Sequence, residues 1–355
     1  MRRTERRRSG RAGLALGALL GWALVGACSS GGTTEVVDSG PRDEGVPEEL
    51  PRDAGDTRDA ELLDAALDGT VDADPPDDGA LAEAETSGPE PLSCAPEPLA
   101  VSRLALPEAS GAVWIDAPIG RGWLVLADSG NEGAGALLNE ADLQTQPLTF
   151  KLDAGAGDDL EGLTLTPSGR LVGLVSSGYL REWSADAAPL DLTRLAAPIT
   201  DDADYLCDPK GGNCGANFEG LCLHPAPKPG GACAGFAVSK ARGELVCVVE
   251  TPAGYRLDTT RRITVGEADQ LSGCDFELEA PHRLVVAGNL FSFSALWEVT
   301  GYQDPATAQA RSLSLTGAAN QEAIAFGPAG LLISFGDTQG LGGVETSPMV
   351  GFRCH

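Results

Sequence analysis

Five acidic residues in this 355-residue chain lie beside short apolar runs of the sequence. Glu161, Glu219 and Glu322 each precede a small residue and a short apolar run, whereas Asp128 and Asp337 each follow an apolar run. If they met, their mutual repulsion would require cations or protons to neutralise it. Carboxylate oxygens without histidine or thiolate partners suit calcium or magnesium rather than transition metals. The candidate ligands for a calcium ion are therefore Glu161, Glu219, Glu322 and Asp128.

A purely structural role is the alternative for these residues. A glutamate before glycine at the start of a strand can cap a turn or bond the backbone of a neighbouring repeat. Asn217 and Asn320, two residues before Glu219 and Glu322, favour ligation because they add oxygen donors at the same place.

The glutamates belong to an internal repeat of 50 to 58 residues, whose five starts are Ser110, Glu161, Glu219, Ser272 and Glu322. Each start leads into a short apolar segment, a turn and a second apolar segment. The second segments are 123–126, 171–174, 235–238, 284–287 and 331–334, and third segments follow at 179–183, 245–249 and 295–299. No amphipathic helical period of useful length is present after residue 92. Short, evenly spaced strands between turn residues predict an all-β fold.

Four strands in a repeat of this length are typical of a β-propeller blade. We predict a single propeller of five four-stranded blades, or six if the stretch 189–215 holds another blade. Only three strands fit after Glu322, so a strand at 98–106 is expected to complete the last blade. The first strand of each blade lines the channel, and the second runs antiparallel beside it. The starts of the first strands and the ends of the second strands must therefore share one mouth, where the five carboxylates and the insert 196–215 would meet.

Cysteine usage indicates an exported protein. Eight cysteines follow Cys28, an even number that favours disulfides in an oxidising compartment. The predicted pairs are Cys94–Cys354, which would join the chain ends of the propeller, and Cys207–Cys214, which would close a tight loop. Four others can pair in three ways: Cys222, Cys233, Cys247 and Cys274. Zinc is disfavoured because no two cysteines are two residues apart and the chain has three histidines.

The N-terminus predicts export and lipidation. An arginine-rich head precedes an uncharged apolar run at 12–27 that is short for a membrane span. Gly26 and Ala27 before Cys28 resemble the lipobox of bacterial lipoproteins, which implies a signal peptide at 1–27 and acylation of Cys28. Ordinary secretion with an incidental cysteine is the alternative. Ser29 is not an acidic retention signal, so the outer membrane or cell surface is favoured over the inner membrane.

The segment 28–92 predicts a disordered acidic tether rich in proline, glycine and alanine. Between residues 31 and 92 there are 19 acidic and 3 basic residues and no aromatic residue. Such a chain cannot bury enough apolar surface to offset the loss of backbone entropy. The propeller domain would then occupy 93–355.

The charge of 93–355 limits its partners. It holds 32 acidic and 16 basic residues, a net charge of −16. This excess argues against nucleic acid and anionic lipid headgroups. We expect a monomer that meets the membrane only through its lipid anchor, with a protein, glycan or small-molecule ligand at the channel mouth.

The repeat starts resemble those of a known group of proteins. Asp159-Leu160-Glu161-Gly162-Leu163 and Asn217-Phe218-Glu219-Gly220-Leu221, together with 271–275 and 320–326, are similar to the repeated motifs of the SdiA-regulated family. They also resemble the propeller domain called esterase-like activity of phytase. The resemblance implies an exported bacterial propeller with calcium as its ion. Ala323 stands where these motifs have glycine, and Ser110 and Ser272 stand where they have glutamate.

Two functions follow from these observations. The first is a cell-envelope lipoprotein that presents its propeller as a binding or scaffolding module, with calcium at the channel mouth. The alternative is a calcium-dependent hydrolase of phosphate or carboxylic esters, in which the ion polarises the substrate. The sequence favours the first, because no Gly-x-Ser-x-Gly, HExxH or phosphate-loop motif supplies a catalytic set. The catalytic residues of the alternative are unknown.

Overall fold

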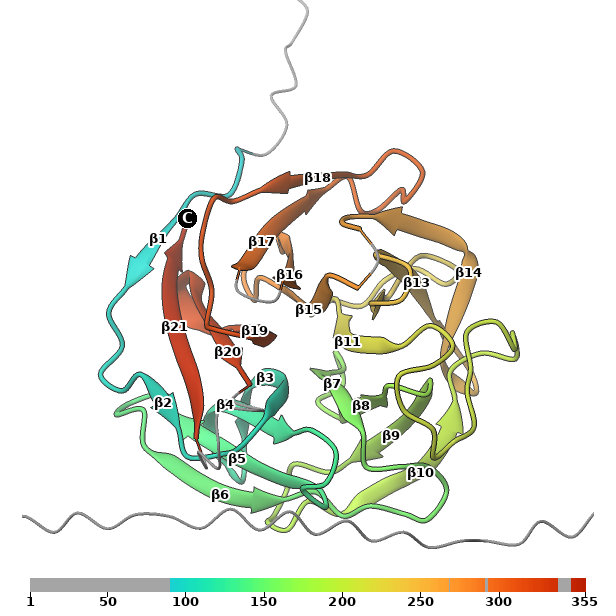
Figure 1. Ribbon diagram of the computed structural model, residues 1–355, viewed down its shortest axis with the longest axis horizontal. Coiled ribbons are helices and arrows are strands. Elements are labelled where there is room, and N and C mark those ends of the chain that lie inside the picture. The colour runs from blue at the N-terminus through green and yellow to red at the C-terminus, as the bar shows by residue number, and fades with distance from the viewer. Residues whose placement is uncertain (1–89, 268, 291–292, 338–345) are drawn as a thin grey trace, which may run out of the picture. The chain divides into compact units, whose positions relative to one another are not determined.

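Five antiparallel sheets surround a central channel in the computed structural model (Figure 1). The structure describes residues 90–355, except 268, 291–292 and 338–345. The predicted all-β propeller of five blades is confirmed. The signal peptide, Cys28 and nearly all of the tether lie outside the described residues. No helix within the described ranges is long and apolar enough to cross a membrane.

Each of blades 1 to 4 is a four-stranded meander in chain order, with the first strand innermost. Blade 1 contains β3 (Ala109–Ala117), β4 (Gly120–Ala127), β5 (Ala134–Asn139) and β6 (Thr145–Thr149). Blade 2 contains β7 (Leu160–Leu165), β8 (Leu171–Val175), β9 (Tyr179–Trp183) and β10 (Leu192–Pro198). Blade 3 contains β11 (Phe218–Leu223), β12 (Gly235–Ser239), β13 (Glu244–Thr251) and β14 (Gly254–Thr264). Blade 4 contains β15 (Leu271–Phe276), β16 (Leu284–Leu290), β17 (Phe293–Thr300) and β18 (Gln309–Ser312).

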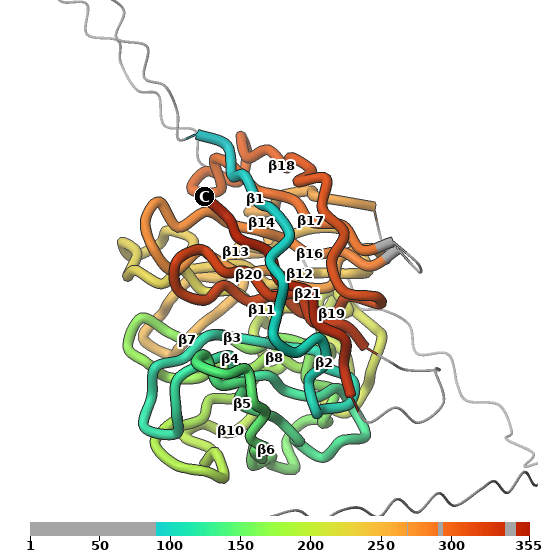
Figure 2. Tube along the Cα trace, turned by 90° about the vertical axis from the view of Figure 1, so that its left-hand side faces the viewer, coloured from blue at the N-terminus to red at the C-terminus, as the bar shows by residue number. Residues whose placement is uncertain are grey.

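Blade 5 closes the ring with strands from both ends of the described chain. It contains β19 (Gln321–Phe326), a 3-10 turn at Pro328–Gly330, β20 (Leu331–Gly336) and β21 (Ser347–Cys354). The N-terminal β1 (Cys94–Glu97) pairs with β21, and the two strands run side by side in both views (Figure 2). Cys94 lies opposite Cys354 in the register, and a disulfide joins them, as the sequence predicts.

The closing strand differs from its predicted range of 98–106. Pairing starts at Cys94, because the disulfide holds this residue against the end of β21, and it stops at Glu97. A second short strand, β2 (Arg103–Leu104), then pairs with the start of β21. Leu104 is fully buried there, among apolar side chains of blades 5 and 1.

No sixth blade is present within the described residues. The stretch 189–215 supplies β10, the outer strand of blade 2, and a loop closed by the Cys207–Cys214 disulfide. The three-way choice among the other cysteines is also resolved. Cys222 pairs with Cys274 between the inner strands β11 and β15, and Cys233 pairs with Cys247 within blade 3.

Apolar side chains hold the blades together face to face. The cluster between blades 1 and 2 includes Leu124, Leu160 and Trp183, all fully buried. Trp183 meets the edge of Phe150 with ring centroids 5.2 Å apart, a favourable aromatic geometry. Tight packing of this kind fixes the relative positions of the inner strands, and thereby the residues at the channel mouth.

Candidate cation site at the channel mouth

Every inner strand carries a β-bulge at the same position near its start. In blade 2, for example, Leu160 pairs with Val175 and Gly162 with Leu174, which leaves Glu161 between them. The five residues bracketed in this way are Ser110, Glu161, Glu219, Ser272 and Glu322. A bulge disrupts the ladder locally and re-aims a side chain. The five repeat starts found in the sequence are thus the five bulged residues.

The glycine after the bulge reflects how closely the inner strands approach. A Cβ added at Gly162 would lie 2.6 Å from the backbone nitrogen of Leu221 in the next blade. A Cβ at Gly220 would lie 2.9 Å from the Cα of Gly273. The channel at this level retains a volume of about 10 Å³, the lower limit for one water molecule. The glycine level therefore closes the channel beneath the bulged residues.

A second ring of residues follows the second strands. One backbone hydrogen bond recurs in every blade, with a length of 2.6 to 3.0 Å. Its donor is the N–H of the residue that follows the last residue of the second strand paired with the first strand. Its acceptor is the carbonyl of the residue two positions before the bulged residue. The donors are Asp128, Ser176, Lys240, Asn289 and Asp337, and the acceptors are Glu108, Asp159, Asn217, Gln270 and Asn320. Side chains at these positions in blades 1, 2, 3 and 5 line the cavity at this mouth, whereas none from blade 4 does.

The mouth opens into a polar cavity of about 320 Å³. All five carboxylates expected there line it: Asp128, Glu161, Glu219, Glu322 and Asp337. Three further charged residues that the sequence did not indicate line the cavity: Glu108, Asp159 and Lys240. The repeat held a signal for two of them, because Glu108 and Asp159 precede bulged residues by two positions, as Asn217 and Asn320 do.

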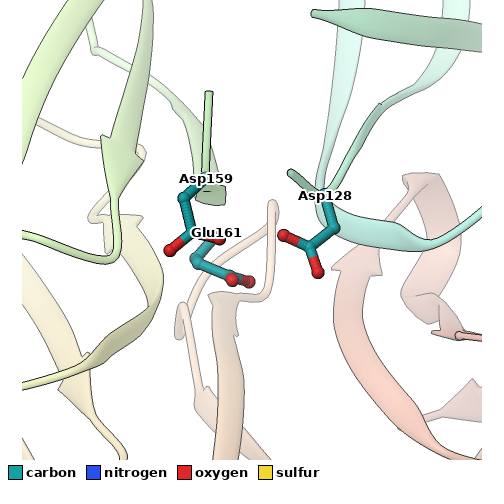
Figure 3. A group of neighbouring side chains, drawn as sticks. All are labelled: Asp128, Asp159 and Glu161. Carbon is teal, nitrogen blue, oxygen red and sulfur yellow. The ribbon is translucent and has the colours of Figure 1, made fainter. Parts of the chain in front are cut away.

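Three of these carboxylates form a compact group. Oxygen atoms of Asp128, Asp159 and Glu161 lie within 4.8 Å of one another, with Asp128 on blade 1 and the other two on blade 2 (Figure 3). Hydroxyl groups brace the group from the same ring, since Ser110 donates to Glu161 and Ser176 donates to Asp159. We call Asp128, Asp159 and Glu161 the acidic triad.

The other glutamates have donors from the protein itself. Lys240 Nζ lies 3.0 Å from Glu219 Oε2, and Asn217 Nδ2 donates to Glu219 Oε1 at 3.0 Å. Asn289 Nδ2 donates to Glu322 Oε1 at 3.0 Å. Of the four predicted metal ligands, the structure thus groups Asp128 and Glu161 with Asp159, while Glu219 and Glu322 lie outside the triad.

Burial makes the bare carboxylates costly. It raises the pKa of Glu161 well above its usual range, and the charges of Glu219 and Asp128 raise it further. Burial likewise raises the pKa of Asp128 to about 7, and that of Glu322 to about 8. The pKa of Glu219 is raised by burial to about 7 although Lys240 lowers it. A cation at the mouth would offset this cost.

The disulfide-closed loop reaches the same cavity. Asn213, next to Cys214, lines the mouth. The loop is fixed against blade 2 because Pro209 O accepts the N–H of Gly157 at 2.8 Å and the hydroxyl of Ser177 at 3.2 Å. The expectation that the insert emerges at this mouth is confirmed, and it brings an amide side chain to the site.

Two buried polar atoms around the mouth lack partners within the described part of the chain. They are Ser272 Oγ, on a bulged residue that is fully buried, and Asn217 Oδ1. A buried oxygen without a partner costs free energy comparable to a lost hydrogen bond. Both atoms therefore suit a bound water, and neither residue lines the cavity at the mouth.

Similarity to known proteins is confined to solved structures. No protein-family model and no curated protein sequence matches the chain. Among solved structures, the chain is similar to a glutaminyl cyclase from Myxococcus xanthus at 17% identity and a TM-score of 0.43, covering 74% of this chain and 98% of that one. It is also similar to the PQQ-bound form of an aldose sugar dehydrogenase from Streptomyces coelicolor at 13% identity and a TM-score of 0.43, covering 75% and 99%. The five-blade assignment rests on the strand pairing described above.

Proposed function

We propose that the propeller binds one hard divalent cation, calcium, at the acidic triad. The observation that carries this proposal is the convergence of three carboxylates from two blades within 4.8 Å. Lys240, the basic residue that lines this cavity, pairs with Glu219 instead. The triad therefore has no positive partner of its own among the described residues, apart from the general field of Lys240.

Calcium fits the donor set. It accepts about six to eight oxygen ligands in a flexible geometry, including carboxylates, amide oxygens and water. The triad supplies carboxylates, and Ser110 and Asn213 line the same cavity. Magnesium is less suited, because it demands a near-octahedral shell and dehydrates reluctantly.

The proposed activity is that of a binding module. An ion held by the triad would lie at the lining of the 320 Å³ cavity, whose remaining space could admit a ligand to it. Lys240 adds a positive charge to the same lining. Together, the ion and Lys240 would favour a ligand with a carboxylate, phosphate or sulfate group, carried by a protein, a glycan or a small molecule.

Calorimetric titration of the full chain with calcium tests the proposal. Asp159→Asn removes one triad charge, and Glu97→Gln removes a carboxylate of β1 that pairs with Arg353 instead. Any weak binding to the acidic segment before residue 90 is common to all three proteins. We expect one saturable site in the wild type and in Glu97→Gln, and its loss in Asp159→Asn. Saturable binding that persists in Asp159→Asn would contradict the triad as the site.

A calcium-dependent hydrolase is the second candidate, and Lys240 in the cavity is the observation that favours it. A metal ion beside a cationic side chain can polarise and hold an ester of phosphate. Generic phosphate and acetate esters, assayed with calcium and with a chelator, separate the two functions. Turnover that requires calcium and is lost in Asp159→Asn would support the hydrolase, whereas calcium binding without turnover supports the binding module.

We also propose that the chain is an exported lipoprotein anchored through Cys28, on the strength of the lipobox-like sequence. Two acyl chains hold a protein stably on a membrane. Cys28→Ala should release the protein into the soluble fraction of the producing cells. A variant that stays with the membrane would rule out acylation at this residue.

A further inference from the structure

The channel has a second mouth, at the end where the inner strands finish. A cavity of about 220 Å³ lies there, and its lining is mainly apolar, including Val113, Trp114, Leu165, Leu223, Phe276 and Leu278. The glycine level, where the channel retains about 10 Å³, separates this lower cavity from the acidic mouth. A ligand in the lower cavity would therefore occupy a site independent of the acidic triad.

A single charged side chain stands among the described residues that line the lower cavity. This is Asp275, near the end of β15. Its Oδ2 accepts the backbone N–H of Phe326 at 2.7 Å, and no lysine or arginine of the described ranges forms an ion pair with it. Burial raises the pKa of Asp275 to about 7, although the N–H groups of Phe326 and Phe276 lower it. The protein itself supplies little compensation for this charge.

The hydrogen bond to Phe326 does not require a charge. In blade 2, Thr164 occupies the position equivalent to Asp275, three residues after the bulged residue. Its neutral hydroxyl oxygen accepts the N–H of Leu223 in the next blade at 3.0 Å. Both hydrogen bonds join an inner strand to the inner strand of the next blade. The carboxylate of Asp275 is therefore more than the inter-blade bond needs, and its partial burial carries a desolvation cost that a neutral hydroxyl avoids.

We infer that the lower cavity binds a small organic cation, a primary ammonium group on a short apolar chain. The ammonium would pair with Asp275, and the chain would pack against the apolar lining. A single carboxylate among apolar side chains does not supply the oxygen shell of calcium or magnesium. The cavity is also smaller than the roughly 300–1,000 Å³ typical of sites for drug-sized ligands, so the ligand is correspondingly small.

Titration of the full chain with n-butylammonium, followed by calorimetry in saturating calcium, tests this site. n-Butanol serves as the neutral probe of similar shape. Asp275→Asn keeps an oxygen to accept the N–H of Phe326 and removes the charge. We expect saturable binding of butylammonium to the wild type. Affinities should be about tenfold weaker or more for Asp275→Asn and for butanol, because each lacks one partner of the charge-assisted hydrogen bond.

Two further variants keep the test decisive. Asp275→Thr copies the inter-blade bond of Thr164, so it gives a folded uncharged variant if Asp275→Asn is unstable. Glu97→Gln removes a carboxylate that pairs with Arg353 outside both cavities, and this variant should bind butylammonium as the wild type does. The inference is wrong if the wild type shows no saturable binding up to about 10 mM. It is equally wrong if the uncharged variants at 275 bind as tightly as the wild type, or if Glu97→Gln abolishes binding.

Discussion

Calcium should raise the melting temperature of this protein, and the rise should depend on Glu161 far more than on Glu219. Both glutamates are bulged residues of inner strands at the same mouth. Glu161 belongs to the acidic triad, whereas Glu219 is paired with Lys240 at 3.0 Å. The two therefore form a matched pair of substitutions that differ in whether the lost carboxylate has a partner within the protein.

The size of the effect follows from mass action. A ligand that binds only the folded state stabilises it by about 2.7 kcal/mol at a hundredfold excess over its dissociation constant. For a domain of this size, each kcal/mol shifts the melting temperature by about 2–4 °C, so the expected rise is roughly 5–10 °C. Glu161→Gln should lose most of this rise, and Glu219→Gln should keep most of it.

The chelated proteins provide a second, opposite comparison. Without calcium, the partly buried Glu161 carboxyl faces the negative charges of Glu219 and Asp128, and desolvation together with these charges raises its pKa. Glu161→Gln removes this cost and should be at least as stable as the wild type in chelator. Glu219→Gln loses the ion pair with Lys240, but it also removes a charge that raises the pKa values of Glu161 and Glu322, so its stability in chelator should change less than that of Glu161→Gln.

Calorimetric scans of the wild type and both variants, in chelator and in millimolar calcium, measure the six melting temperatures. The acidic N-terminal segment is the same in all three proteins, so its loose binding of calcium cancels in the comparison. A wild type whose melting temperature is indifferent to calcium would refute the cation site. A rise that survives Glu161→Gln but disappears in Glu219→Gln would refute the assignment to the triad.

Three further predictions concern pH, packing and ring closure. In chelator, the free energy of unfolding should fall as pH rises from about 4 to 8. The pKa values of Asp128 and Glu322 in the folded protein, about 7 and about 8, exceed those in the unfolded chain. The stabilising contribution of these two groups is therefore complete below about pH 4, and it is lost as pH rises through about 7 and 8. Urea titrations across this range check the slope, and a stability that increases with pH would contradict it. Gly162→Ala should lower the free energy of unfolding by about 1–3 kcal/mol, because the added Cβ would lie 2.6 Å from the backbone nitrogen of Leu221. Gly230→Ala is the control with no atom within 4 Å, and equal unfolding free energies for both variants would refute the close approach. Replacing both Cys94 and Cys354 by serine should lower the unfolding free energy by up to about 5 kcal/mol in the chain-entropy model. Denaturant titration of the variant and the wild type measures this difference. An unchanged denaturation midpoint would argue against a role of the disulfide in closing the ring.

The repeat positions could be found from the sequence because their physical cause is local. A bulged residue followed by glycine recurs wherever an inner strand must approach its neighbour too closely for a side chain. This constraint places Glu161-Gly162 and Glu219-Gly220 at equivalent points of successive blades. The even number of cysteines after the N-terminal region and the room for only three strands after Glu322 likewise favoured a ring closed near Cys94 and Cys354.

The grouping of side chains at the mouth was decided only by the tertiary structure. Asp128 meets Asp159 and Glu161 because blade 1 packs against blade 2, and Glu219 is set apart because Lys240 extends to it from the end of β12. The repeat pattern alone makes Glu161, Glu219 and Glu322 equivalent. Their environments differ because each depends on the residue that the neighbouring strand or blade presents across the channel. These partners come from distant parts of the chain and are brought to one mouth by the packing of the blades. Periodicity could therefore locate the ring of residues, but it could not predict which of them lie together.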